Sequence, residues 1–177
     1  MHPREIERES FAIIEREAGP HDFSAAKWRI VRRMIHTTAD FDYLHSVHFS
    51  PGAVAAGVAA IQAGGTVYTD TEMARAGIRA RGLSRFGGRA VCLMATPEIA
   101  NAALAAGTTR AKAAVDAVAD RLAGAIYVVG NAPTALLRLI ELVRQGRARP
   151  ALVVGLPVGF VNAAESKAWL LDQDMPY

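Results

Sequence analysis

Hydrophobic positions follow two different patterns along the chain. Residues 3–18 and 24–38 carry apolar residues at helical spacing, and Pro3 and Ser24 are residue types that favour the start of a helix. From about residue 47 onward, short apolar runs alternate with alanine-rich segments whose composition favours helix. The pattern predicts two amphipathic helices, followed by a region in which strands and helices alternate.

Four apolar runs predict strands, and a weaker run at residues 47–49 predicts a fifth. The four runs are 66–69, 90–95, 125–129 and 151–155, and the helical segments around them begin at Pro51, Pro97, Thr109 and Pro133. Strands with almost continuous apolar residues are typical of parallel sheets covered on both faces. The sequence therefore predicts an α/β fold: a doubly wound, three-layer α/β/α sandwich with a mainly parallel, flavodoxin-like sheet of about five strands.

Length and composition indicate one domain in a reducing compartment. A chain of 177 residues buries enough surface to fold without disulfides or metals, and its single cysteine, in an apolar strand, is expected to be a buried inert thiol. The first ten residues contain acidic side chains and no apolar signal-peptide core. The uncharged residues 50–69 are interrupted by proline and glycine, which argues against a membrane span. We expect a cytoplasmic protein.

Positive charge is concentrated in one segment. Residues 73–97 contain five arginines and no acidic residue, although the net charge of the whole chain is only +3. A solvated surface and an anion-binding surface both explain such a run. Phe86 is the single aromatic residue within it, so a small polyanion fits better than nucleic acid.

Polar side chains follow several of the predicted strands. Ligands of doubly wound sheets bind beyond the carboxyl ends of the strands, where Asp70, Thr71 and Asn131 lie. These residues are also good helix caps, and a free helix N-terminus can itself hold a ligand carboxylate. Arg110 is predicted in the first turn of a helix, where its charge opposes the helix dipole, so an anionic partner would explain its position.

Histidines and carboxylates gather between residues 36 and 48. A metal site there is disfavoured because His45 and His48, if extended, point to opposite faces. His36, at the end of the second helix, is the candidate proton donor and acceptor, and Thr37 is expected to help orient its ring. An ordinary histidine at a helix end is the alternative.

Familiar cofactor and hydrolase motifs do not occur in the sequence. The chain has no GxGxxG after a strand, no GxxxxGK[ST] and no GxSxG, so dinucleotide binding, nucleotide hydrolysis and serine hydrolase chemistry are unsupported.

Several segments together resemble the precorrin-8X methylmutase family, which includes the cobalt-precorrin-8 enzymes of cobalamin biosynthesis. The similar segments are 9–14, 33–36, 49–52, 69–73, 107–110, 130–136, 155–161 and 164–167, in the family's order and over nearly the whole chain. Residues 130–136 (GNAPTAL) and the GxPVGFV and AAESK motifs are the most specific.

The resemblance implies an isomerase that moves a methyl group from C-11 to C-12 of precorrin-8X or cobalt-precorrin-8. The product would be hydrogenobyrinate or its cobalt form. The protein itself would need no cofactor or bound metal. The family resemblance does not distinguish the metal-free substrate from the cobalt-containing one. The catalytic histidine falls on His36. Substrate contacts fall on Ser10 and Arg110, and further contacts are expected from the following positions: Thr37, Asp70, Thr71, Arg79, Arg81, Asn131 and Thr134.

The resemblance also implies a homodimer with tetrapyrrole pockets lined by both subunits, and no nucleic-acid or membrane partner. Residues 1–177 are expected to form a single methylmutase domain that lacks the family's C-terminal strand and helix. That difference leaves open a second hypothesis, a truncated corrinoid-binding module without catalytic activity.

Overall fold

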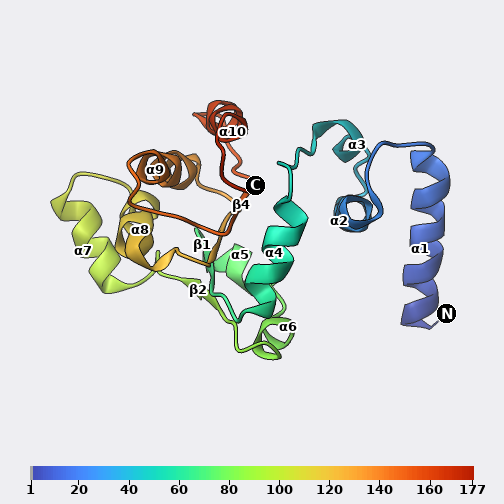
Figure 1. The fold of residues 1–177 in the computed structure, drawn as a ribbon, viewed down its shortest axis with the longest axis horizontal. Helices are drawn as coiled ribbons and strands as arrows, with labels where there is room; N and C mark the ends of the chain where they lie inside the picture. The colour runs from blue at the N-terminus through green and yellow to red at the C-terminus, as the bar shows by residue number, and fades with distance from the viewer. Residues whose placement is uncertain (1) are drawn as a thin grey trace. The chain divides into compact units, whose positions relative to one another are not determined.

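The computed structural model describes residues 2–177 as two compact units (Figure 1). The first unit ends at His48 and the second comprises Phe49–Tyr177. Each unit has its own helices and its own packing, and the sheet lies entirely in the second.

The first unit consists of α1 (Pro3–Ala18), α2 (Ala25–Thr38) and the short α3 (Tyr43–Ser46). The two predicted amphipathic helices are confirmed, and Ser24 caps α2 by accepting a hydrogen bond from the Lys27 N–H at 3.4 Å. A buried apolar face forms along α2, from Trp28, Val31 and Ile35. This face places His36 at the last turn of the helix, beside α1.

The expected fifth strand does not form. Residues 47–49 have no regular secondary structure, and the sheet has four strands. The run joins the two units, and Ser50, directly after it, bonds to the backbone of Tyr177, with its N–H donating to the Tyr177 carbonyl at 3.0 Å. These residues form the connection between the units, and their apolar side chains are therefore not a sign of a strand.

The sheet of the second unit is entirely parallel. Its strands are β1 (Val67–Thr69), β2 (Ala90–Cys92), β3 (Ile126–Val129) and β4 (Leu152–Gly155), in the order β2-β1-β3-β4. This order matches the first four positions of the flavodoxin-like arrangement. The order reverses between β1 and β3, so the chain leaves these neighbouring strands toward different faces of the sheet.

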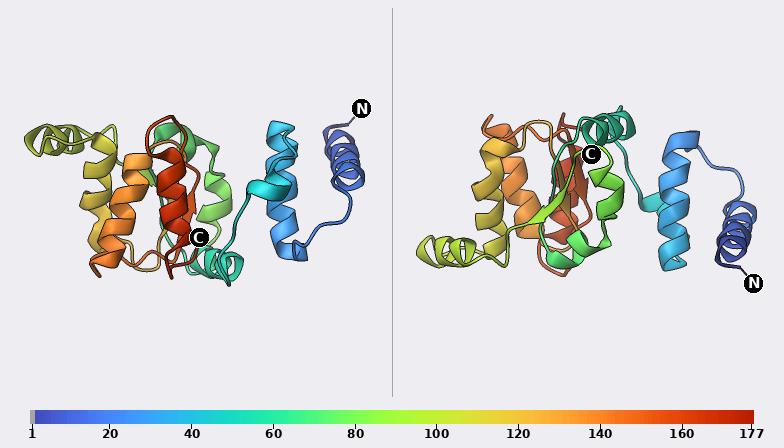
Figure 2. Two further views of the ribbon diagram at one scale, coloured as in Figure 1. Left: turned by 90° about the horizontal axis from the view of Figure 1, so that it is seen from above. Right: turned by 90° about the horizontal axis from the view of Figure 1, so that it is seen from below.

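Helices cover both faces of the sheet (Figure 2). The helices of this unit are α4 (Ala53–Gln62), α5 (Glu72–Gly77), α6 (Ala80–Ser84), α7 (Pro97–Ala105), α8 (Arg110–Val118), the 3₁₀ turn η1 (Ala119–Arg121), α9 (Pro133–Arg144) and α10 (Ala163–Leu171). Alternate strand residues divide between the layers: Tyr68, Tyr127 and Val153 pack with α8, α9 and α10, whereas Val67 and Ile126 pack with α4 and α6. The predicted three-layer α/β/α arrangement is therefore present in this unit.

Gly65, just before β1, supplies a test of this packing. A Cβ atom there would lie 2.7 Å from the Ala60 carbonyl oxygen and 2.8 Å from that of Gly124, both backbone atoms. We expect Gly65→Ala to lower the free energy of unfolding by about 2–3 kcal/mol because neither backbone atom yields easily. Gly77→Ala is the control, since a Cβ there meets nothing within 4 Å, and it should be neutral or slightly stabilising. Urea unfolding measures both; equal midpoints for the two variants would contradict the packing described.

Candidate functional site

The predicted catalytic histidine makes a direct contact with a predicted substrate residue. The Ser10 Oγ lies 2.8 Å from His36 Nδ1, so the last turn of α2 and the middle of α1 are joined at this pair. The Thr37 hydroxyl, which the sequence predicts to orient this ring, donates to the Arg33 carbonyl of its own helix at 2.9 Å. Within residues 2–177, the His36 Nε2 atom has no hydrogen-bond partner, so it is the nitrogen left for chemistry.

The Ser10–His36 pair lines a hollow of about 410 Å³ between α1 and α2. Aliphatic side chains make most of its wall, and two carboxylates, Glu9 and Glu17, also line it. The other lining residues are Ile6, Ile13, Ile14, Ile35, Ala39 and Phe41. An apolar wall with one proton-exchanging group is typical of small-molecule sites. The hollow therefore combines an apolar surface with an imidazole that has one nitrogen held and one free.

Asp70 joins the ends of β1 and β3 from a completely buried position. Its carboxylate accepts hydrogen bonds from the backbone N–H groups of Gly130 at 2.9 Å, Asn131 at 2.8 Å and Ala132 at 2.6 Å. These donors belong to the loop after β3 and to the N-cap of α9. Asp70 thus holds the loop and is not exposed for direct contact with a ligand.

The loop that leads into α9 already holds a carboxylate of the protein itself. The N–H groups of Gly130, Asn131 and Ala132 bond to Asp70, so these three donors are not free for a ligand carboxylate. Asn131 is not the cap either, since Ala132 occupies the N-cap position without any side-chain bond. The Asn131 side chain is exposed at the carboxyl edge of the sheet. Thr71, by contrast, caps α5 as expected, accepting from the Ala74 N–H at 3.2 Å.

Arg110 and Thr134 come together at the starts of two neighbouring helices. Thr109 caps α8 and its hydroxyl lies 3.2 Å from the Thr134 hydroxyl in the first turn of α9. Arg110 follows as the first residue of α8, with an exposed side chain that forms no ion pair within the described part of the chain. This edge therefore presents a guanidinium and two hydroxyls to solvent.

Arg79 and Arg81 are not part of that cluster. Arg79 is the N-cap of α6 and Arg81 lies within it, both with exposed side chains. The end of α6 lies beside the amino end of the sheet, since the Gly88 N–H donates to the Leu83 carbonyl just before β2. The end of the helix that carries these arginines thus lies at the edge of the sheet opposite Asp70.

An exposed apolar segment follows β4. Leu156, Val158, Phe160 and Val161 are all exposed, and Phe160 is completely so. The Val158 N–H donates to the Asn131 carbonyl at 3.1 Å, which places the segment next to the loop after β3. A contiguous exposed apolar surface commonly marks a binding site.

Other ionisable groups of the sheet stay neutral. Burial, and then the charge of Asp70, raises the pKa of Tyr127, whose side chain is in the core. Partial burial also raises the pKa of the Cys92 thiol, although this side chain is half-buried and not fully buried as the sequence predicts. No group of three or more His, Cys, Asp or Glu side chains among residues 2–177 is arranged to hold a metal ion, and His45 lies in α3, not in an extended segment.

No helix in the same residues has the length and apolar character of a membrane span.

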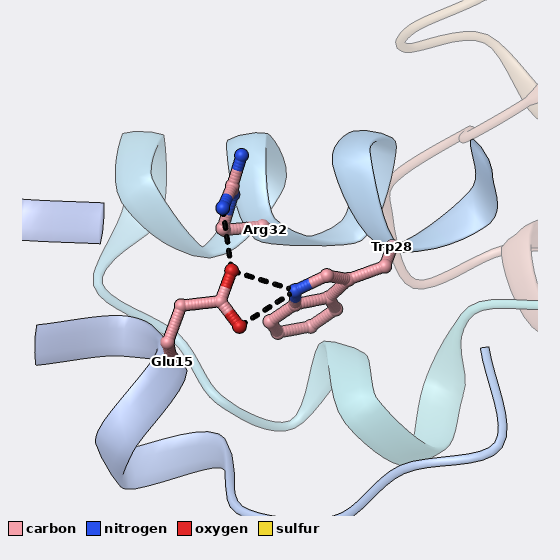
Figure 3. Close-up of polar contacts among 3 residues, drawn as sticks. All are labelled: Glu15, Trp28 and Arg32. Atoms are coloured by element: carbon pink, nitrogen blue, oxygen red, sulfur yellow. Dashed lines mark hydrogen bonds and ion pairs between the residues drawn. The ribbon is translucent and has the colours of Figure 1, made fainter. Parts of the chain in front are cut away.

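Sequence reasoning missed other contacts that join α1 and α2. The Glu15 carboxylate accepts from the Trp28 indole N–H at 2.9 and 3.0 Å and pairs with the Arg32 guanidinium (Figure 3). The signal was present as four-residue spacing: Glu7, Phe11 and Glu15 lie on one face of α1.

Comparison with known proteins supplies the family. The family model described as precorrin-8X methylmutase matches residues 5–177. A cobalt-precorrin-8 methylmutase of Priestia megaterium is 40% identical over 177 residues, covering 100% of this chain and 79% of its relative. One from Salmonella typhimurium is 43% identical over 182 residues, covering 99% of this chain and 85% of that protein.

Solved structures agree with these matches. The precorrin-8X methylmutase of Thermus thermophilus superposes with a TM-score of 0.89 at 52% identity, covering 98% of this chain and 84% of that one. Together the matches define a methylmutase, which is an isomerase. The chain belongs to the precorrin-8X methylmutase family.

The buried contacts of Asp70 predict a large effect on stability. In Asp70→Asn one oxygen becomes an NH₂ group that cannot accept from the backbone, so at least one N–H beside this buried side chain loses its partner. We expect a loss of about 3 kcal/mol in the free energy of unfolding, measured by urea titration. Asp120→Asn, on an exposed residue of η1, is the matched control. A loss no larger than that of the control would show that the three bonds contribute little.

The Glu15 contacts predict a pH dependence. The hydrogen bond from Trp28 lowers the pKa of Glu15 against the opposing effect of burial, and Arg32 lowers it further. The folded state therefore favours the carboxylate, and this stabilisation is complete above the ordinary pKa of 4.5 and lost as pH falls through the lower folded-state pKa. We expect the Tm difference between the unmodified protein and Glu15→Gln to be largest near pH 7 and to shrink in acid. A Tm difference that does not change with pH would contradict this assignment.

Proposed function

We propose that this chain catalyses the reaction of its family, the methyl shift from C-11 to C-12 that converts precorrin-8X, or cobalt-precorrin-8, in cobalamin biosynthesis. The observation that carries the proposal is the Ser10–His36 pair at a mainly apolar hollow, in a chain that matches the family model over residues 5–177.

His36 is the proposed proton donor and acceptor. In this assignment the Nδ1–H donates to the Ser10 hydroxyl in both protonation states of the ring, so Nε2 alone exchanges a proton with the macrocycle. The hydrogen bond to Ser10 then does not have to re-form during the reaction. The rearrangement itself is internal to the substrate, and the protein contributes orientation and one proton relay.

Substrate binding is assigned to groups that the structure leaves accessible. Arg110 is proposed to pair with a peripheral carboxylate, while Thr134 and the Asn131 side chain offer hydrogen bonds at the same edge. The exposed segment 156–161 suits the apolar plane of a tetrapyrrole. The hydroxyls of Thr37 and Thr71 bond to the backbone, so we assign these residues to local structure, and we likewise assign Asp70 to positioning.

The oligomeric state and location follow from the family resemblance. We propose a homodimer in the cytoplasm, acting on a tetrapyrrole and on neither nucleic acid nor membranes.

A corrinoid-binding module without activity is the alternative, and the family matches favour the enzyme. The two hypotheses predict different numbers of precorrin-8X equivalents affected per protein. Purified protein mixed with excess precorrin-8X converts many equivalents if it is an enzyme, whereas a binding module shifts the absorption spectrum of one equivalent only.

Substitution of His36 tests the catalytic assignment. We expect His36→Ala to lower kcat by about 10²–10⁴-fold, because general acid–base catalysis contributes that much, while tetrapyrrole binding persists. Ser10→Ala should reduce kcat less, since the imidazole stays but loses its orienting bond. His45→Ala, an exposed histidine of α3, is the control. The readout is the absorption spectrum under steady-state turnover, and wild-type kcat in His36→Ala would exclude the assigned role.

A further inference from the structure

The contact between α1 and α2 is built from polar and aromatic side chains at matching intervals. Glu7, Phe11 and Glu15 recur every four residues on α1, and Trp28, Arg32 and His36 recur every four residues on α2. The helices meet through these rows, with Glu15 opposite Trp28 and Arg32, and Phe11 opposite Arg32 and His36. We call the two rows the polar seam.

Phe11 lies at the centre of the polar seam, in contact with the catalytic imidazole. Its ring centroid is 5.0 Å from that of His36, and the ring planes are inclined by 54°, a common geometry for aromatic pairs. The guanidinium carbons of Arg32 and Arg33 lie 4.4 and 4.8 Å from the Phe11 centroid, within the range of cation–π contacts. Phe11 is half-buried, so these groups cover most of its ring.

Both guanidiniums are themselves tethered to α1. Arg32 pairs with Glu15, whose carboxylate also accepts from the Trp28 indole (Figure 3). Arg33 donates to Glu7 at 2.7 Å. Each arginine therefore contacts Phe11 while an ion pair restricts its movement, and the phenyl ring is restrained by groups on both helices.

A planar imidazole needs more than one restraint to keep a fixed orientation. The Ser10 hydroxyl holds Nδ1, but a single hydrogen bond to a rotatable hydroxyl leaves the ring free to tilt about that contact. The Phe11 ring opposes such tilting because it packs against the imidazole. The direction in which Nε2 points is then set by two contacts, one polar and one aromatic.

We propose that Phe11 is a positioning residue for His36, holding the imidazole at the tilt in which Nε2 meets the substrate. The inference rests on the proposed function of His36 and adds a residue that does not touch the reacting atoms. Proton transfer requires aligned donor and acceptor, so loss of the ring contact lowers the rate of the chemical step with little effect on substrate binding.

Phe11→Leu removes the aromatic ring and keeps an apolar side chain of similar size. We expect kcat to fall about 10- to 100-fold, with KM within about twofold of the unmodified enzyme. Phe11→Tyr retains the ring and should keep most of the kcat, because Phe11 also borders a second open hollow of about 410 Å³. Phe86→Leu, a half-exposed phenylalanine of the second unit, is the matched control and should change neither constant. An unchanged kcat in Phe11→Leu, or no recovery in Phe11→Tyr, would overturn the proposal.

A measurement without substrate separates this inference from the function itself. The ¹⁵N chemical shifts of the His36 ring, at a pH where the ring is neutral, should report mainly the Nδ1–H tautomer in the unmodified protein and in Phe86→Leu. In Phe11→Leu they should move toward the average of two exchanging tautomers. If the unmodified protein itself shows averaged tautomers, Phe11 does not hold the ring, whether or not the variants fold. Failure of the unmodified protein to convert precorrin-8X would instead refute the proposed function and leave the ¹⁵N result standing.

Discussion

The carboxylate of Asp70 fills a gap that the topology of the sheet creates. Strands β1 and β3 are neighbours, but the chain leaves them toward different faces, so three backbone N–H groups after β3 point into a space without a partner strand. Backbone N–H groups left without a partner beside a buried side chain are costly, and one carboxylate satisfies all three at once. A buried charge is tolerated there because it is fully hydrogen-bonded.

The proposed substrate groups inherit their positions from this contact. Asp70 fixes the loop after β3, which begins α9, and Thr134 in the first turn of α9 meets Thr109 at the start of α8. Arg110 is the next residue along. A side chain that no ligand reaches therefore determines where the exposed guanidinium and hydroxyls of this edge are presented.

Much of the fold was predictable because it depends on local patterns. Both N-terminal helices, four strands and the starts of α7 and α9 follow from periodicity, composition and the positions of serine and proline. The run 47–49 misled because Val47 and Phe49, two apolar residues at alternate positions of a connection, look the same as a short strand. A connection and a strand of this length are distinguished only by whether another strand lies beside them in the folded structure.

The site was predictable to a smaller extent. The family resemblance pointed to His36 and Ser10, and the structure brings their side chains together. The roles of Asp70 and Asn131 were not accessible, because they depend on two strands separated by about sixty residues of chain. Arg79 and Arg81 were chosen for their charge, yet charge alone does not tell at which edge of a sheet a side chain lies.

The polar seam also determines which alignment of α1 and α2 is allowed. Apolar contacts tolerate sliding, since one aliphatic side chain replaces another at modest cost, but charged partners do not. A shift of one helical turn would take Glu15 away from the Trp28 indole and Arg32 away from Phe11, leaving partly buried polar groups unpaired. The polar contacts therefore favour the one register in which serine and imidazole are partners.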